Sequence, residues 1–95
     1  MIRFSTIICK ERSKMGIGVR SLSRMLDISP THLRRLEASQ SKPSEDLVKK
    51  FSTVLGVDFD FLMISTNRIP SDIQEYLIRN PSEIRKIRAQ ITTEA

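Results

Sequence analysis

The chain has 95 residues, of which 39% are apolar, enough for one small core but not for two separate cores. Only three Gly and four Pro are present, and abundant Leu, Ile, Arg, Lys and Glu favour an all-α fold. Cys9 and His32 are the only residues of their kinds, which excludes an internal disulfide and a tetrahedral Cys/His metal site. No segment has the length of a secretion signal or a membrane span, so we expect a cytoplasmic protein with no membrane, metal or cofactor partner.

The net charge of +5 is distributed unevenly along the chain. Residues 1–44 hold nine Lys and Arg against three Asp and Glu, and residues 45–95 hold seven against eight. The first part therefore carries +6 and the second part −1. Clustered cations gain affinity for a polyanion by releasing its condensed counterions, so we expect the first part to bind nucleic acid. A membrane surface would attract the same charge less specifically.

Two helices are predicted at the start of the chain. One spans residues 3–14 and is stopped by Gly16. The other begins after Gly18 and ends near Asp27, and its apolar residues fall within one narrow sector at about 100° per residue. These apolar residues are Val19, Leu22, Met25 and Leu26.

Three further helices follow, each with a recognisable N-terminal cap. Ser29 caps a third helix over residues 30–38, and the Pro that follows Ser29 suits the first helical position because it has no amide to leave unpaired. Ser44, followed by two acidic residues, begins the fourth helix. Asp58 caps a short fifth helix that ends near residue 64 and closes the core.

Residues 65–95 are expected to form a helical tail distinct from the domain at residues 1–64. A linker precedes one helix from Ser71 to Asn80 and another that begins after Pro81. Two short helices with narrow apolar stripes cannot bury themselves, so we expect them to pack on the domain, on a second copy or on another protein. The stripe residues are Ile73, Tyr76, Leu77, Ile84, Ile87 and Ile91.

Residues 19–36 carry the most informative pattern, a short helix, a tight turn at Asp27 and a capped second helix. This arrangement is typical of the helix-turn-helix motif, which lays its second helix in the major groove of DNA. On that second helix Leu33 and Leu36 point to one side, and a basic face with short side chains lies opposite. The opposite face comprises Pro30, Thr31, Arg34, Arg35 and Ala38.

A face of this composition suits the base edges of duplex DNA. Arg can present two donors to O6 and N7 of guanine, and the Thr31 methyl and Pro30 ring can meet a thymine methyl. A charged helix face is also compatible with simple exposure to solvent. The surrounding residues therefore decide between the two interpretations.

Over roughly residues 4–63 the chain resembles the Xre family, the repressor and Cro type of helix-turn-helix regulator. The resemblance runs through the segments VRSLSRMLDISPTHLRRLE and LVKKFSTVLGVDFDFLM. Its spacing is more telling than any one residue, with a small residue at Ser23, a turn residue at Asp27 and an acid at Glu37. The resemblance implies a five-helix repressor-like domain followed here by two short helices.

The resemblance also implies roles for individual residues. The residues expected to contact base edges are Pro30, Thr31, Arg34 and Arg35. The residues expected to contact phosphates are Val19 through its backbone, Arg20, His32, Ser41, Lys42 and Ser44. An architectural ion pair is expected between Arg12 and Glu37.

The chain departs from the family pattern at four positions. Gln is frequent in the family where Val19 stands, Ala where Ser23 stands, and Gly where Asp27 and Ser39 stand. Asp can adopt the left-handed turn, so we expect the fold to survive. Val19 offers no side-chain amide to a phosphate, so DNA affinity is expected to depend more on Arg20, Lys42 and Lys14.

The sequence therefore predicts a sequence-specific DNA-binding transcriptional regulator, in the first place a repressor. Its tail would pair two recognition helices about one DNA turn apart, ~34 Å. An antitoxin would use the same fold on its operator while the tail masks a partner enzyme. A protein-interaction adaptor would have kept the fold and lost DNA binding. The presence of Arg34 and Arg35 on the open face argues against this class. An enzyme is the least expected class, because the single His has no nucleophile or carboxylate at motif spacing.

Overall fold

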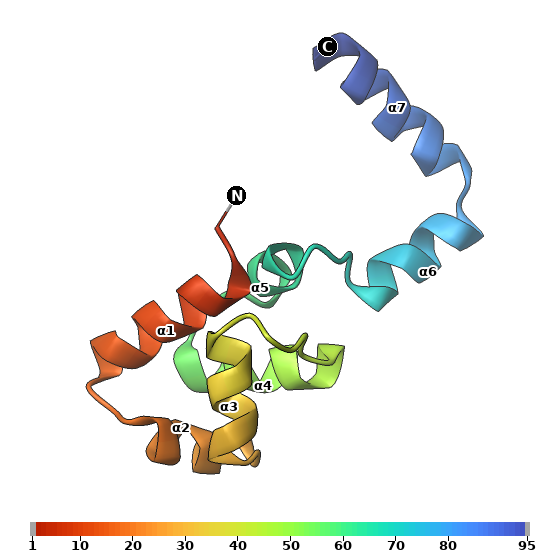
Figure 1. Cartoon of the computed structure of the whole chain (residues 1–95). Helices are drawn as coiled ribbons and strands as arrows, with labels where there is room; N and C mark the ends of the chain where they lie inside the picture. The colour runs from red at the N-terminus through yellow and green to blue at the C-terminus, as the bar shows by residue number, and fades with distance from the viewer. Residues whose placement is uncertain (1, 95) are drawn as a thin grey trace.

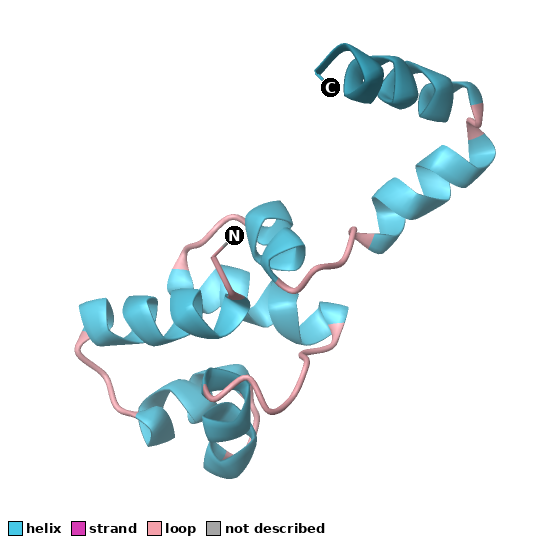
Figure 2. Ribbon diagram, turned by 45° about the horizontal axis from the view of Figure 1, so that its top comes forward, coloured by secondary structure: helices cyan, strands magenta, loops and turns pink. Residues whose placement is uncertain are grey.

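The computed structural model describes residues 2–94, and within that range every regular element is an α-helix. Figure 1 shows these helices in chain order, and Figure 2 shows the loops that join them. The helices are α1 Phe4–Met15, α2 Val19–Leu26, α3 Pro30–Glu37, α4 Glu45–Leu55, α5 Phe59–Ser65, α6 Ser71–Arg79 and α7 Ser82–Glu94. The predicted all-α fold is confirmed, and the helices lie within about one residue of their expected bounds.

The core is built from the apolar faces of the five helices α1 to α5. Its buried side chains are Phe4, Ile7, Ile8, Leu22, Leu26, Leu33, Leu36, Leu47, Val48, Phe51, Leu55, Leu62 and Met63. The rings of Phe4 and Phe51 meet edge to face with centroids 5.2 Å apart, which joins α1 to α4. Cys9 is half-buried at the side of this core.

Local capping chemistry fixes where the helices begin and end. Ser29, Ser44 and Asp58 each accept a hydrogen bond from the backbone amide three residues further on, at 3.0, 3.1 and 2.9 Å. Gly16 and Gly56 end α1 and α4 in the left-handed conformation, with φ of 66° and 68°. These contacts join residues close in sequence, which explains why the helix bounds could be predicted.

Met25 shares the predicted apolar sector of α2, yet its side chain is 51% exposed. Leu22 and Leu26 occupy the inward positions of α2 one turn apart and are fully buried. Met25 lies at the edge of their sector and lines a shallow surface depression with residues of α4.

Helices α6 and α7 extend away from the bundle as a tail (Figure 1). Neither helix contains a buried residue, so the expected burial against the domain does not occur in the single chain. The Cα radius of gyration is 16.0 Å, whereas a compact chain of this length would have about 12 Å. The bundle itself continues slightly past residue 64, because α5 ends at Ser65 and Thr66 is buried. Between residues 2 and 94, no helix is both long enough and apolar enough to cross a bilayer.

Candidate nucleic-acid interface

The turn between α2 and α3 reverses the chain within three residues. Asp27 adopts the left-handed conformation with φ 57° and ψ 46°, and the amide of Ile28 donates to the carbonyl of Ser23 at 3.0 Å. Ser23 is 1% exposed, and its hydroxyl donates to the carbonyl of Arg20 at 2.9 Å. A small, internally satisfied side chain therefore lets α2 and α3 approach closely.

Helix α3 separates its apolar and basic residues onto opposite sides. Leu33 and Leu36 are 0% and 1% exposed and anchor the helix in the core. The expected base-contacting residues lie on the other side, with Thr31, Arg34 and Arg35 exposed and Pro30 half-buried. The anchored side holds α3 in place while the basic side remains open to a ligand.

A bidentate ion pair ties the end of α3 to α1. The Nε and Nη2 of Arg12 donate to the two carboxylate oxygens of Glu37 at 2.7 and 2.9 Å, and Nη1 donates to the carbonyl of Ile17 at 3.1 Å. The side chains are 21% and 11% exposed, respectively. The hydrogen bonds to Glu37 raise the pKa of the Arg12 guanidinium. The pair therefore braces α3 against α1 and the loop before α2.

The expected phosphate-contacting residues lie at the start of α2, on α3 and on the loop at residues 38–44. Val19 begins α2, whose N-cap Gly18 provides no side-chain acceptor, so the first-turn amides have no side-chain cap. The exposure of the other candidates varies. Arg20, Lys42 and Ser44 are exposed, and His32 and Ser41 are half-buried. The Ser44 oxygen already caps α4, which leaves its hydroxyl hydrogen to donate.

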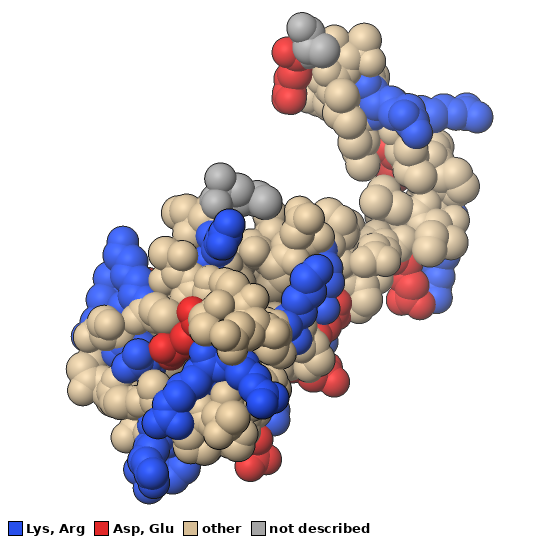
Figure 3. Space-filling view, in the orientation of Figure 1, with Lys and Arg blue, Asp and Glu red and all other residues tan. Residues whose placement is uncertain are grey.

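Positive charge covers the part of the bundle that holds these residues. Figure 3 shows Lys and Arg side chains spread over the face formed by α1, α2 and α3, with few Asp or Glu among them. The described residues contain no group of three or more His, Cys, Asp or Glu that could hold a metal ion. The chemistry of this face is that of a polyanion-binding surface.

The residues expected to contact a second copy or a partner lie away from α3, on the tail. Most of this stripe is open, with Ile73 45%, Tyr76 53% and Ile87 45% exposed. Leu77 is half-buried. The remaining members, Ile84 and Ile91, are 40% and 60% exposed. Sequence reasoning missed Ile78, which is 76% exposed and lies next to Leu77, about 100° around α6 from the stripe.

Sequence reasoning also missed the contacts that attach the tail to the bundle. The carboxylate of Glu45 accepts hydrogen bonds from the Ser71 amide at 3.0 Å and from the Ser71 hydroxyl at 2.6 Å. Arg68 donates to the carbonyl of Pro43. We call these contacts, made by Glu45, Arg68, Ser71 and the Pro43 carbonyl, the tail clamp. The partners are 25 or 26 residues apart, so no local pattern in the sequence reveals them.

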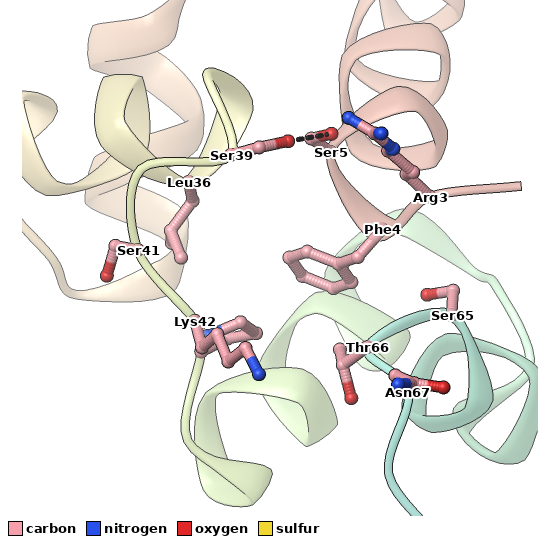
Figure 4. A pocket seen from close by; sticks show the side chains of 11 residues that line it. Arg3, Phe4, Ser5, Leu36, Ser39, Ser41, Lys42, Ser65, Thr66 and Asn67 are labelled. Atoms are coloured by element: carbon pink, nitrogen blue, oxygen red, sulfur yellow. Dashed lines mark hydrogen bonds between the residues drawn. The ribbon is translucent and has the colours of Figure 1, made fainter.

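A shallow cavity of about 310 Å³ lies beside the tail clamp, between the start of α1, the loop at residues 38–44 and the end of α5 (Figure 4). The Phe4 ring projects toward it, and the Ser39 hydroxyl donates to that of Ser5 at 2.6 Å above it. The lining residues are Arg3, Phe4, Ser5, Leu36, Ser39, Ser41, Lys42, Pro43, Ser65, Thr66 and Asn67. The loop therefore has an incompletely packed side facing α5.

A family model described as helix-turn-helix matches residues 10–62, more than half of the chain. The chain belongs to the Xre-type helix-turn-helix family. The resemblance inferred from the sequence is thus confirmed, and this helix-turn-helix protein is a DNA-binding transcriptional regulator. The match ends within α5 and leaves the tail outside it. No curated protein and no solved structure is significantly similar to the chain.

Proposed function

We propose that this helix-turn-helix protein is a sequence-specific repressor that binds duplex DNA as a homodimer in the cytoplasm and catalyses no reaction. The proposal rests on the arrangement of α3, whose buried apolar face and exposed basic face lie on opposite sides of the helix. Two fully buried Leu residues fix the helix, and Thr31, Arg34 and Arg35 face outward. A basic face on a rigid helix can hold its donors at fixed positions in the major groove.

In the proposed complex, α3 enters the major groove and its Arg side chains pair with guanines. Phosphates on either strand are held by the first-turn amides of α2, which begins at Val19, and by Arg20, His32, Ser41, Lys42 and Ser44. These phosphate contacts set the position of α3, and the base contacts select the sequence. Repression follows when the bound protein covers a promoter.

The tail supplies the proposed dimer contact. Ile84, Ile87 and Ile91 recur at intervals of three and four residues on α7, and each is at least 40% exposed. Isolated helices of this length are marginal in water, so pairing with the same helix of a second copy would stabilise them. A two-fold axis through that contact would repeat the recognition helix on a symmetric operator.

Selection of binding sites from random duplex DNA tests the central proposal. We expect an enriched site with two related half-sites whose centres lie about 10 base pairs, or one helical turn, apart or a multiple of that. A reporter placed behind the selected site should lose expression when the protein is made. Failure to enrich any sequence at low salt would favour the adaptor, and increased expression would contradict repression.

The dimer is tested by changing the apolar stripe of α7. Ile87→Ser removes a central apolar side chain of the stripe, and Arg85→Ser changes the same helix off the stripe. Sedimentation should show the wild type and Arg85→Ser as dimers and Ile87→Ser shifted toward monomer at the same concentration. Equal sedimentation of all three proteins would contradict a dimer built on this stripe.

The exposed apolar tail also supports a second candidate, an antitoxin whose tail covers a partner enzyme. This function predicts that the protein of a neighbouring gene co-purifies with the full chain and is released by Ile87→Ser. The repressor predicts a homodimer whether or not that second protein is present.

A further inference from the structure

The tail clamp holds the start of α6 against the start of α4. The N-cap of α6 is Pro70, which provides no side-chain cap. The Glu45 carboxylate takes over that function, because it accepts from the amide and the hydroxyl of Ser71 at the first position of α6. These hydrogen bonds also lower the pKa of Glu45. Glu45 thus anchors the first residue of α6 to the start of α4.

A second contact of the tail clamp holds the linker before α6. Arg68 donates from Nη2 to the carbonyl of Pro43 and from Nε to the hydroxyl of Thr66 at 3.1 Å. Thr66 is 8% exposed, and its hydroxyl donates to the carbonyl of Met63 at 2.6 Å. Arg68 therefore joins the end of α5 to the loop at residues 38–44 and ties the linker to the bundle.

The same short segment bears the tail clamp and three of the expected phosphate contacts. Ser41, Lys42 and Ser44 are expected to meet DNA, and Pro43 and Glu45 hold the tail. Ser44 also accepts a hydrogen bond from the α4 backbone, so Pro43 and Glu45 flank a residue whose position is fixed by the helix it caps. The tail is therefore attached to the bundle within one or two residues of the groups that face phosphate, at a point that the α4 cap holds in place.

We propose that the tail clamp makes Glu45, Arg68 and Ser71 positioning residues that set which spacing of operator half-sites the protein accepts. The inference rests on the proposed homodimer. The dimer contact lies on the tail, and DNA lies on the bundle, so the angle between them decides the separation of the two recognition helices. The tail clamp constrains that angle where the tail leaves the bundle, because it anchors the linker and the first residue of α6. Moving the half-sites by two base pairs shifts them by about 7 Å and rotates them by about 70°, which a clamped dimer cannot follow.

The test uses the full chain with Glu45→Ala, Ser71→Ala and the double variant. Asp46→Ala is the matched control, because Asp46 is the other acid in the first turn of α4 and no hydrogen bond joins it to the tail within residues 2–94. Its loss therefore weakens the same helix terminus without opening the tail clamp. Affinity is measured for a single half-site and for paired half-sites at the selected spacing and at two base pairs more and fewer.

For the wild type and Asp46→Ala we expect one preferred spacing. In the clamp variants that preference should fall by about threefold to tenfold, the range that one ordinary hydrogen bond supplies. Single half-site affinity should change by less than about twofold. If the clamp variants are dimers by sedimentation and keep the spacing profile of the wild type, the role of the tail clamp is overturned and the proposed homodimer is not. A monomeric wild type would overturn the proposed homodimer and the inference together.

Discussion

Arg12 donates hydrogen bonds to Glu37 and to the carbonyl of Ile17 from a mostly buried position. Replacing one partner leaves a poorly hydrated charge without its counterion, whereas replacing both leaves none. We expect Arg12→Met and Glu37→Leu each to lower the free energy of unfolding by about 2 to 4 kcal/mol. The double variant should lose less than the two single losses combined. Urea denaturation of the four proteins gives the coupling energy, and strictly additive losses would contradict a coupled pair.

Arg35 and Lys42 are both exposed and both cationic, but we expect them to contact different parts of DNA. If Arg35 pairs with a guanine, Arg35→Ala should cost about 1 to 3 kcal/mol on the selected site and relax the preference at one base pair. Lys42→Ala should weaken binding to all sequences by a similar factor, because a phosphate contact does not depend on the base.

Both variants are measured on the selected site and on single-base variants of it at one fixed salt concentration, which keeps electrostatic loss apart from loss of specificity. Arg34→Ala serves as a second test of the same face. If Arg34→Ala and Arg35→Ala each lower affinity uniformly and leave base preference unchanged, α3 does not contact base edges through these side chains.

The helices that could be predicted are those whose ends depend on nearby residues. Ser29 caps α3 through an amide three residues away, and the buried pair Leu33 and Leu36 follows the helical period. The tail clamp could not be predicted, since its partners meet only when α4 and α6 are already in place. The exposure of Met25 could not be predicted either, because helical periodicity gives a sector but not the extent of the neighbouring helix that covers it.

The turn between α2 and α3 allows the stability cost of a strained left-handed residue to be measured. Asp27 lies in the left-handed region, where a β-branched side chain is strained and Gly is not. Asp27→Val should therefore lower the free energy of unfolding by about 1 to 2 kcal/mol. Asp27→Gly should stay within about 1 kcal/mol of the wild type. Thermal unfolding measures both, and a Val variant as stable as the Gly variant would contradict the strained turn.

The sequence predicted a bundle and a tail but not how the two are arranged. The apolar stripe residues lie mostly exposed on α6 and α7. In the proposed dimer a second chain would bury them, and no single chain contains that partner. The hydrogen bonds of the tail clamp instead give the tail a defined departure from the bundle. In the proposed dimer, the stripe provides the surface through which two copies pair, and the tail clamp affects the angle between that surface and the bundle.

The uneven charge along the chain predicts that DNA binding depends strongly on salt concentration. Residues 1–44 carry the excess of Lys and Arg, and three cations in each protomer, Lys14, Arg20 and Lys42, are expected near phosphates. Six neutralised phosphates in a dimer complex imply a slope of about −5 for the logarithm of the association constant against the logarithm of salt concentration. Lys42→Ala removes two of these contacts from the dimer and should make the slope shallower by about 2.

Lys86→Ala is the control for that slope, because it removes the same charge from α7, away from the proposed DNA surface. We expect its slope to match the wild type if the slope reports local phosphate contacts rather than net charge. Titration of the selected duplex at four or five salt concentrations gives all three slopes. Equal reductions for Lys42→Ala and Lys86→Ala would mean that net charge alone attracts the DNA and that the loop at residues 38–44 does not hold phosphate. A slope near zero for the wild type would exclude an electrostatic complex and favour the adaptor.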